Sequence, residues 1–156
     1  MTLPDRFVSD DQLTKAIIAG VALVLGACIL SQVMLQLGGG PRDDPIDVSD
    51  QLPESLANDT GPFDAKAPFI SSGGGFYPEK AVFDIGLALG GLLFLGLGVE
   101  MFLRTNAQLR SGGRPIWANL FNLAQLGTAL IVGTSLVMVT RNPLDQRFVA
   151  HIFYAM

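Results

Sequence analysis

The feature that most constrains this chain is a run of 22 residues, 16–37, without a charged side chain. As an α-helix such a run spans about 33 Å, close to the roughly 30 Å hydrocarbon core of a bilayer. A signal peptide is the competing interpretation, because Lys15 precedes the run. Its apolar part would be shorter, about 7–15 residues, and a small-residue cleavage site would follow it. Since a glycine turn at 38–40 follows instead, a retained transmembrane helix is predicted.

Two further apolar runs and a short one complete the pattern. Residues 81–103 carry two charges, residues 116–139 carry none, and residues 148–156 would make about 13 Å of helix, under half a bilayer. Only 15% of the residues are charged and 49% are hydrophobic, which leaves too little charge to cover a soluble domain of this size. We therefore predict an all-α, polytopic helical membrane protein with three complete transmembrane helices and a truncated fourth.

The segment between the first two runs, residues 38–80, has a different composition. It contains six of the nine prolines and eight acidic residues against three basic ones. Its backbone could not be satisfied in hydrocarbon, and the segment is too poor in apolar residues to build a core. It is predicted to be an acidic extracytoplasmic loop, with one short helix near 49–57 and a glycosylation sequon at Asn58.

Arginines set the predicted orientation of the chain. The connection 104–115 carries three of them and no acid, so the positive-inside rule places it in the cytoplasm. The N-terminal segment 1–15 is then cytoplasmic, and the short loop 140–147 lies on the outer side. The same arginines are candidates for contact with an anionic lipid headgroup, although the positive-inside rule already accounts for them. They are Arg104, Arg110 and Arg114.

Polar groups inside the apolar runs are the best candidates for a site, because each is costly in hydrocarbon without a partner. In one interpretation they line a polar cavity for a lipid headgroup or an ion. In the other they are wetted at interface depth or bond across helices, which is favoured for Glu100. The candidates for the cavity are Gln36, Asp84 and Gln125. Small residues such as Gly86 and Gly90 are predicted to pack helices within one bundle.

Signatures of catalysis and cofactor binding are absent from the sequence. It contains no P-loop, no catalytic-triad context and no His/Glu metal spacing. Cys28 and His151 are the only residues of their types, so a Cys/His metal cluster is excluded and the histidine is expected to hydrogen-bond between helices. No basic stripe with interleaved aromatics exists to follow nucleic acid. We predict no enzyme, no cofactor, no metal and no nucleic-acid partner.

Three short motifs lie at or near the starts of the second, third and fourth predicted helices. They are the stretch 67–79 (APFISSGGGFYPE), Phe121-Asn122-Leu123, and His151 four residues before Ala155. Together they resemble motifs of the DRAM family, which comprises damage-regulated autophagy modulators, relatives acting in GPI-anchor lipid remodelling, and fungal plasma-membrane regulators of lipid distribution. The family-like positions are Ile70, Ser71, Pro78, Glu79, Asn122 and His151. Pro78 and Glu79 also have a structural explanation, since proline and an acid both suit the start of a helix.

The resemblance implies a six-span protein, of which this chain is roughly the first half, acting on or through lipids without an established catalytic mechanism. We accordingly predict a non-enzymatic multi-pass protein that regulates membrane lipid organisation or trafficking, as autophagy modulators do. Membrane lipids are the expected partners, and a second copy or a C-terminal half would cover the short fourth helix. The alternatives are half of a small transporter or channel, and a lipid-remodelling enzyme using Glu79, Asp84 and His151.

Overall fold

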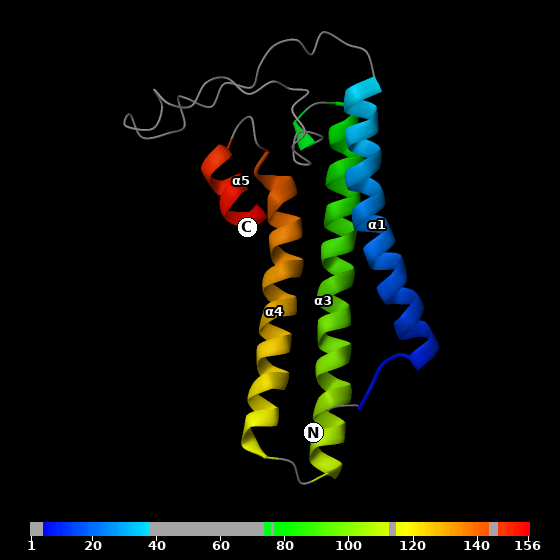
Figure 1. Ribbon diagram of the computed structural model, residues 1–156, viewed down its shortest axis with the longest axis vertical. Helices are drawn as coiled ribbons and strands as arrows, with labels where there is room; N and C mark the ends of the chain where they lie inside the picture. The colour runs from blue at the N-terminus through cyan, green and yellow to red at the C-terminus, as the bar shows by residue number, and fades with distance from the viewer. Residues whose placement is uncertain (1–4, 38–73, 76, 113–114, 144–146) are drawn as a thin grey trace.

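The computed structural model describes residues 5–37, 74–75, 77–112, 115–143 and 147–156. This part of the chain forms four helices (Figure 1). Three of them are long and apolar enough to cross a membrane, so the predicted all-α fold with three membrane-crossing helices and a short fourth one is confirmed. The four helices are α1 (Asp10–Leu37), α3 (Glu79–Ser111), α4 (Ile116–Arg141) and α5 (Phe148–Ala155).

Several positions that carried predictions lie outside the described residues. These are the segment 38–73 of the acidic loop with its expected short helix and sequon at Asn58, the motif residues Ile70 and Ser71, Arg114, and the side chain of Gln36.

Two of the helices, α1 and α3, extend beyond the apolar runs from which they were predicted. α1 begins six residues before the predicted span, at Asp10, and α3 continues past residue 103 to Ser111. Arg104 and Arg110 therefore lie on α3, and the prediction that they belong to a loop is wrong. The physical reason is that hydropathy marks only the part of a helix in hydrocarbon, whereas the helical backbone bonds persist into the headgroup layer. At about 50 Å, α3 is longer than the roughly 40–45 Å of a whole bilayer.

The start of α1 is fixed by a reciprocal cap. The Gln12 backbone N–H donates to Ser9 Oγ at 3.3 Å, and the Ser9 N–H donates to Gln12 Oε1 at 2.9 Å. Asp10 and Asp11 in the first turn complement the positive end of the helix dipole. These polar residues start the helix before the hydrocarbon begins, which the apolar run alone does not reveal.

The central helix is α3, which packs against both α1 and α4, while α5 packs against α4 (Figure 1). Gly86 and Gly90 face α1, where an added Cβ would collide with Ala27 and Val24. Close packing of this kind holds helices together in lipid, so the predicted role of these glycines within one bundle is confirmed.

A second glycine face on α3 meets α4. A Cβ at Gly91 would lie 2.6 Å from the Gly133 carbonyl oxygen, and one at Gly98 would collide with Ala129. At about 100° per residue, this face lies about 110° around α3 from the face that contacts α1. The sequence of α3 thus accounts for its position between two partners.

A cluster of buried apolar residues lies at the end of the bundle where α5 lies. It consists of Ala27, Phe83, Leu87 and Val139, with Tyr154 of α5 packed against it. We call this the α5 end, and the opposite end, where α3 leads into α4, the loop end. Toward the loop end α1 diverges from α3, and the chain N-terminal to α1 returns to α3 (Figure 1).

Candidate functional site

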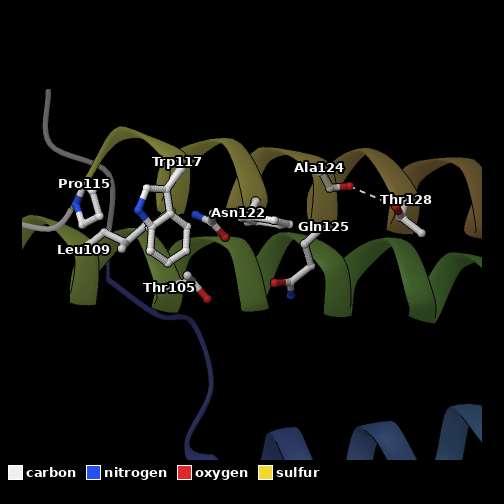
Figure 2. Close-up of a pocket in the computed structure, with 10 residues that line it drawn as sticks. Thr105, Leu109, Pro115, Trp117, Asn122, Ala124, Gln125 and Thr128 are labelled. Atoms are coloured by element: carbon white, nitrogen blue, oxygen red, sulfur yellow. Dashed lines mark hydrogen bonds between the residues drawn. The ribbon is translucent and has the colours of Figure 1, made fainter.

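A groove with a volume of about 620 Å³ lies between α3 and α4 at the loop end. Figure 2 shows the side chains of Asn122 and Gln125 extending from α4 toward α3, with Thr105 on α3 below them. The lining is mixed, because amides and hydroxyls alternate with apolar and aromatic groups. The groove is lined by Thr105, Leu109, Pro115, Trp117, Ala118, Phe121, Asn122, Ala124, Gln125 and Thr128.

A second cavity of about 570 Å³ continues the groove toward the middle of the helices. The two cavities share Gln125 and Thr128. The α4 positions that line them recur every three or four residues from Ala118 to Val132, so they form one face of the helix over about 21 Å. We call the combined cavity the α3–α4 groove. Its inner part is lined by Ile17, Phe94, Leu97, Gly98, Met101, Gln125, Thr128, Ala129 and Val132.

Asn122 joins the two walls of the groove. Its side chain is only 3% exposed, and its Nδ2 donates to the Phe102 carbonyl oxygen of α3 at 3.1 Å. Its Oδ1 accepts no hydrogen bond within the part of the chain that the structure describes. Asn122 is thus an interhelical link that retains one unused acceptor.

Among the polar groups of the groove, Gln125 is the one whose amide most needs a hydrogen-bond partner from a ligand. It lies three residues beyond Asn122 on the same side of α4, is half-buried, and lines both halves of the groove. Its amide makes no hydrogen bond with any described residue, whereas the nearby Thr128 hydroxyl is satisfied by the Ala124 carbonyl at 3.0 Å (Figure 2).

The depth of Gln125 makes an unsatisfied amide costly. It stands nine residues into α4, about 14 Å from the start of that helix, whereas the headgroup layer is only about 5–8 Å deep on each side. At that depth an amide without a partner costs several kcal/mol, since hydrocarbon offers no hydrogen bond.

Aromatic groups surround the mouth of the groove at the loop end. Trp117 is exposed one residue into α4, and its ring meets Phe121 edge to face with centroids 5.9 Å apart. An indole at this level suits the membrane–water interface.

A charged cluster lies at the same end, beside the groove on α3. Glu100 is only 4% exposed and accepts hydrogen bonds from the backbone N–H groups of Phe7, at 2.8 Å, and Val8, at 3.5 Å. Arg104 donates from Nε to Glu100 at 2.7 Å and also contacts Asp10 and the Val8 carbonyl. The interpretation of Glu100 as a group bonding within the protein therefore agrees with its contacts.

This cluster was not predicted, although one signal was available. Glu100 and Arg104 are four residues apart, the spacing at which side chains on a helix form ion pairs. The cluster can be recognised only when two further facts are known. One is that α3 continues beyond residue 103, and the other is that the chain before α1 folds back onto α3. Arg104 is occupied by these internal bonds, while Arg110 remains exposed in the last turn of α3.

Asp84 and Gln125 are not brought together. Asp84 pairs with Lys80 at 2.9 Å near the α5 end, and it lines a separate cavity of about 310 Å³ with Thr140 and Arg141. Gly98, which shares a cavity with Gln125, lies 14 residues after Asp84 on α3, a separation of about 21 Å along the helix. The single polar cavity expected for these residues therefore does not form among the described residues.

The other two residues of the predicted catalytic trio lie at the α5 end in structural surroundings. His151 is 1% exposed, and its Nδ1 donates to the Asn142 carbonyl oxygen at 2.7 Å, which ties α5 to the residue that ends α4. Glu79 is fully buried as the first residue of α3, directly after Pro78. An acid at that position complements the positive end of the helix dipole.

Comparison with known proteins adds no family to this picture. No family model, no curated protein and no solved structure matches the chain. Within the described ranges, no three His, Cys, Asp or Glu side chains gather closely enough to hold a metal ion. The candidate site therefore depends on the groove itself, and the resemblance to the DRAM family stays a prediction.

Proposed function

We propose that this membrane protein binds a lipid in the α3–α4 groove and acts as a non-enzymatic regulator of membrane lipid organisation or trafficking. The observation that carries the proposal is Gln125, a half-buried amide at hydrocarbon depth that has no hydrogen-bond partner among the described residues. A lipid drawn into the groove so that one of its ester or amide groups reaches Gln125 would supply that partner and cover the apolar wall beside it.

The dimensions of the groove suit an acyl chain. From Gln125 to Val132 the inner part of the groove runs about 10 Å along α4, enough to hold the first part of an acyl chain below a polar group at Gln125. The inner half is lined mainly by apolar groups such as Phe94, Leu97 and Met101, and the polar groups gather toward the loop end. This order matches a lipid, whose chains lie deep and whose polar backbone lies near the surface.

The resemblance to DRAM-type proteins supports a role in lipid regulation, with autophagy as one setting. The proposed leaflet is the cytoplasmic one, because Arg104 and Arg110 lie at the loop end. Membrane-impermeant maleimide would test this orientation in a Cys28→Ala background. In sealed vesicles with the cytoplasmic face outward, we expect it to label Gln108→Cys directly and Tyr77→Cys only after the membrane is opened. The reverse pattern would contradict the assignment.

Photolabelling tests the groove directly. The purified chain would be placed in nanodiscs containing phosphatidylcholine with a diazirine on one acyl chain, and the labelled peptides would be mapped by mass spectrometry. We expect labels to concentrate on residues 94–109 of α3 and 117–132 of α4. Gln125→Leu should reduce groove labelling about fivefold, since one hydrogen bond contributes about 1 kcal/mol.

Asn119→Leu is the matched control, because it removes an exposed amide from the same helix outside the groove. Labelling should be unchanged in this variant. Labels spread evenly around all three long helices, or an equal loss in both variants, would contradict lipid binding in the groove.

A further inference from the structure

The segment before α1 forms a strap on α3. The strap is Asp5–Ser9, and both N–H and C=O groups of its backbone form hydrogen bonds with α3. The Phe7 and Val8 N–H groups donate to Glu100, while the Val8 carbonyl accepts from Arg104. Arg104 also bonds Glu100 and Asp10, so one buried acid and one half-buried base hold the strap together. Bonds to ionised groups are stronger than neutral ones, which makes this attachment specific.

The strap matters because the first turns of α1 lie before the contact at Gly20, where an added Cβ would be 3.2 Å from Leu93 of α3. At the α5 end α1 is held against α3 through Gly86 and Gly90, but its first turns carry exposed side chains such as Asp11, Gln12 and Lys15. Figure 1 shows α1 diverging from α3 over this part and the strap returning to α3. Ile17, about one turn before Gly20, lines the α3–α4 groove.

We infer that Glu100 and Arg104 are positioning residues for the α3–α4 groove: by holding the strap on α3, they fix the first turns of α1 as one wall of that groove. This inference rests on the proposed function, since it concerns how the same lipid is retained. When the strap is released, the first turns of α1, before the contact at Gly20, move away from α3, Ile17 leaves the groove, and the inner part of the groove opens sideways to the bilayer.

Two distances follow this movement in a Cys28→Ala background. Spin labels at Phe7→Cys and Gln108→Cys, both exposed positions, report the strap relative to α3. Labels at Leu30→Cys and Leu89→Cys, also exposed, report the α1–α3 contact near the α5 end. We expect Glu100→Ala to broaden and lengthen the first distribution and to leave the second unchanged.

Lipid retention is measured on the same variants with the diazirine phosphatidylcholine in nanodiscs. Labelling of residues 94–101 should fall at least threefold in Glu100→Ala and in Arg104→Ala. Glu100→Gln, which keeps an acceptor for the Phe7 N–H, should fall between wild type and Glu100→Ala. Asp11→Asn is the matched control, because it breaks an exposed pair with Lys15 on the same helix and should change neither measurement.

The outcomes separate this inference from the proposed function. A released strap with unchanged labelling of residues 94–101 would overturn the inference and leave lipid binding intact. An unreleased strap in Glu100→Ala would also overturn it. Failure of the wild-type groove to label would overturn both. Loss of the Leu30–Leu89 distance in Glu100→Ala would show general unfolding of the bundle, which contradicts a positioning role.

Discussion

The two ends of α1 meet α3 in different ways. Near the α5 end the two helices pack closely, because Gly86 and Gly90 leave room for the side chains of Ala27 and Val24. Toward the loop end the helices separate, and the charged strap bridges them through Glu100 and Arg104. The first contact depends on van der Waals packing and works inside hydrocarbon. The second depends on hydrogen bonds to ionised groups, which are tolerated only close to the headgroup layer.

The two contacts between α1 and α3 therefore have different roles. The glycine contact cannot change without disrupting the bundle, because packed small residues tolerate no added volume. The strap can detach while the bundle persists, since it joins a short segment to the surface of one helix. The region next to the proposed lipid groove is therefore the one that can move.

The largest expected effect comes from filling the glycine contact. Gly86→Leu places a large side chain where even a Cβ collides with Ala27, and we expect a loss of about 3 kcal/mol in bundle stability. Gly26→Leu is the control, because no atom lies within 4 Å of a Cβ added at Gly26. Steric-trap unfolding in bicelles measures both, and equal losses in the two variants would contradict the described packing.

Removal of the link between α5 and α4 should have the next largest effect. His151→Ala deletes a buried ring and its bond to the Asn142 carbonyl, which should cost about 2 kcal/mol and release α5 first. Phe153→Ala deletes a larger but mostly exposed ring, so a smaller loss is expected there. Proteolysis kinetics at α5 compare the two, and faster cleavage in Phe153→Ala would refute this role of His151.

A local effect is expected from breaking the strap. Glu100→Leu removes the acceptor of the Phe7 and Val8 N–H groups, so hydrogen exchange at these two amides should accelerate at least tenfold. Exchange in the second half of α1, near Ala27, should not change. Accelerated exchange throughout α1 would mean that its two contacts with α3 open together as one cooperative unit, which would contradict their independence.

The smallest effect concerns the cap of α1. Ser9→Ala removes the hydroxyl that accepts from the Gln12 N–H and should destabilise the first turn by about 1 kcal/mol. Exchange of the N–H groups at Gln12 and Leu13 should rise a few-fold, while the strap amides keep their protection. Thr14→Ala, which loses only a bond to the Asp10 carbonyl within the same helix, is the control.

Much of the fold could be predicted because hydrocarbon imposes simple rules. Uncharged runs as long as 16–37 and 116–139 have the length of a membrane-spanning helix, and the glycines of α3 indicated close helix packing. The helix ends were less predictable. Ser9, Asp10 and Arg104 lie beyond the apolar runs, where polar caps and ion pairs extend a helix that hydropathy no longer marks.

The candidate site was predictable only in part. Gln125 was identified from its cost in hydrocarbon, and the structure places it in the α3–α4 groove. Its grouping with Asp84 was not found, because composition does not tell how far apart two polar groups lie along neighbouring helices. The strap required a tertiary contact between residues more than 90 positions apart, which no local pattern reveals.

The central claim is that a lipid completes the α3–α4 groove at Gln125, and a structure of the full protein in lipid nanodiscs tests it most directly. We expect chain-like density along the groove with a polar group about 2.7–3.2 Å from the Gln125 amide. A helix from a second copy, or from a further part of the protein, filling the groove and bonding Gln125 would contradict the claim.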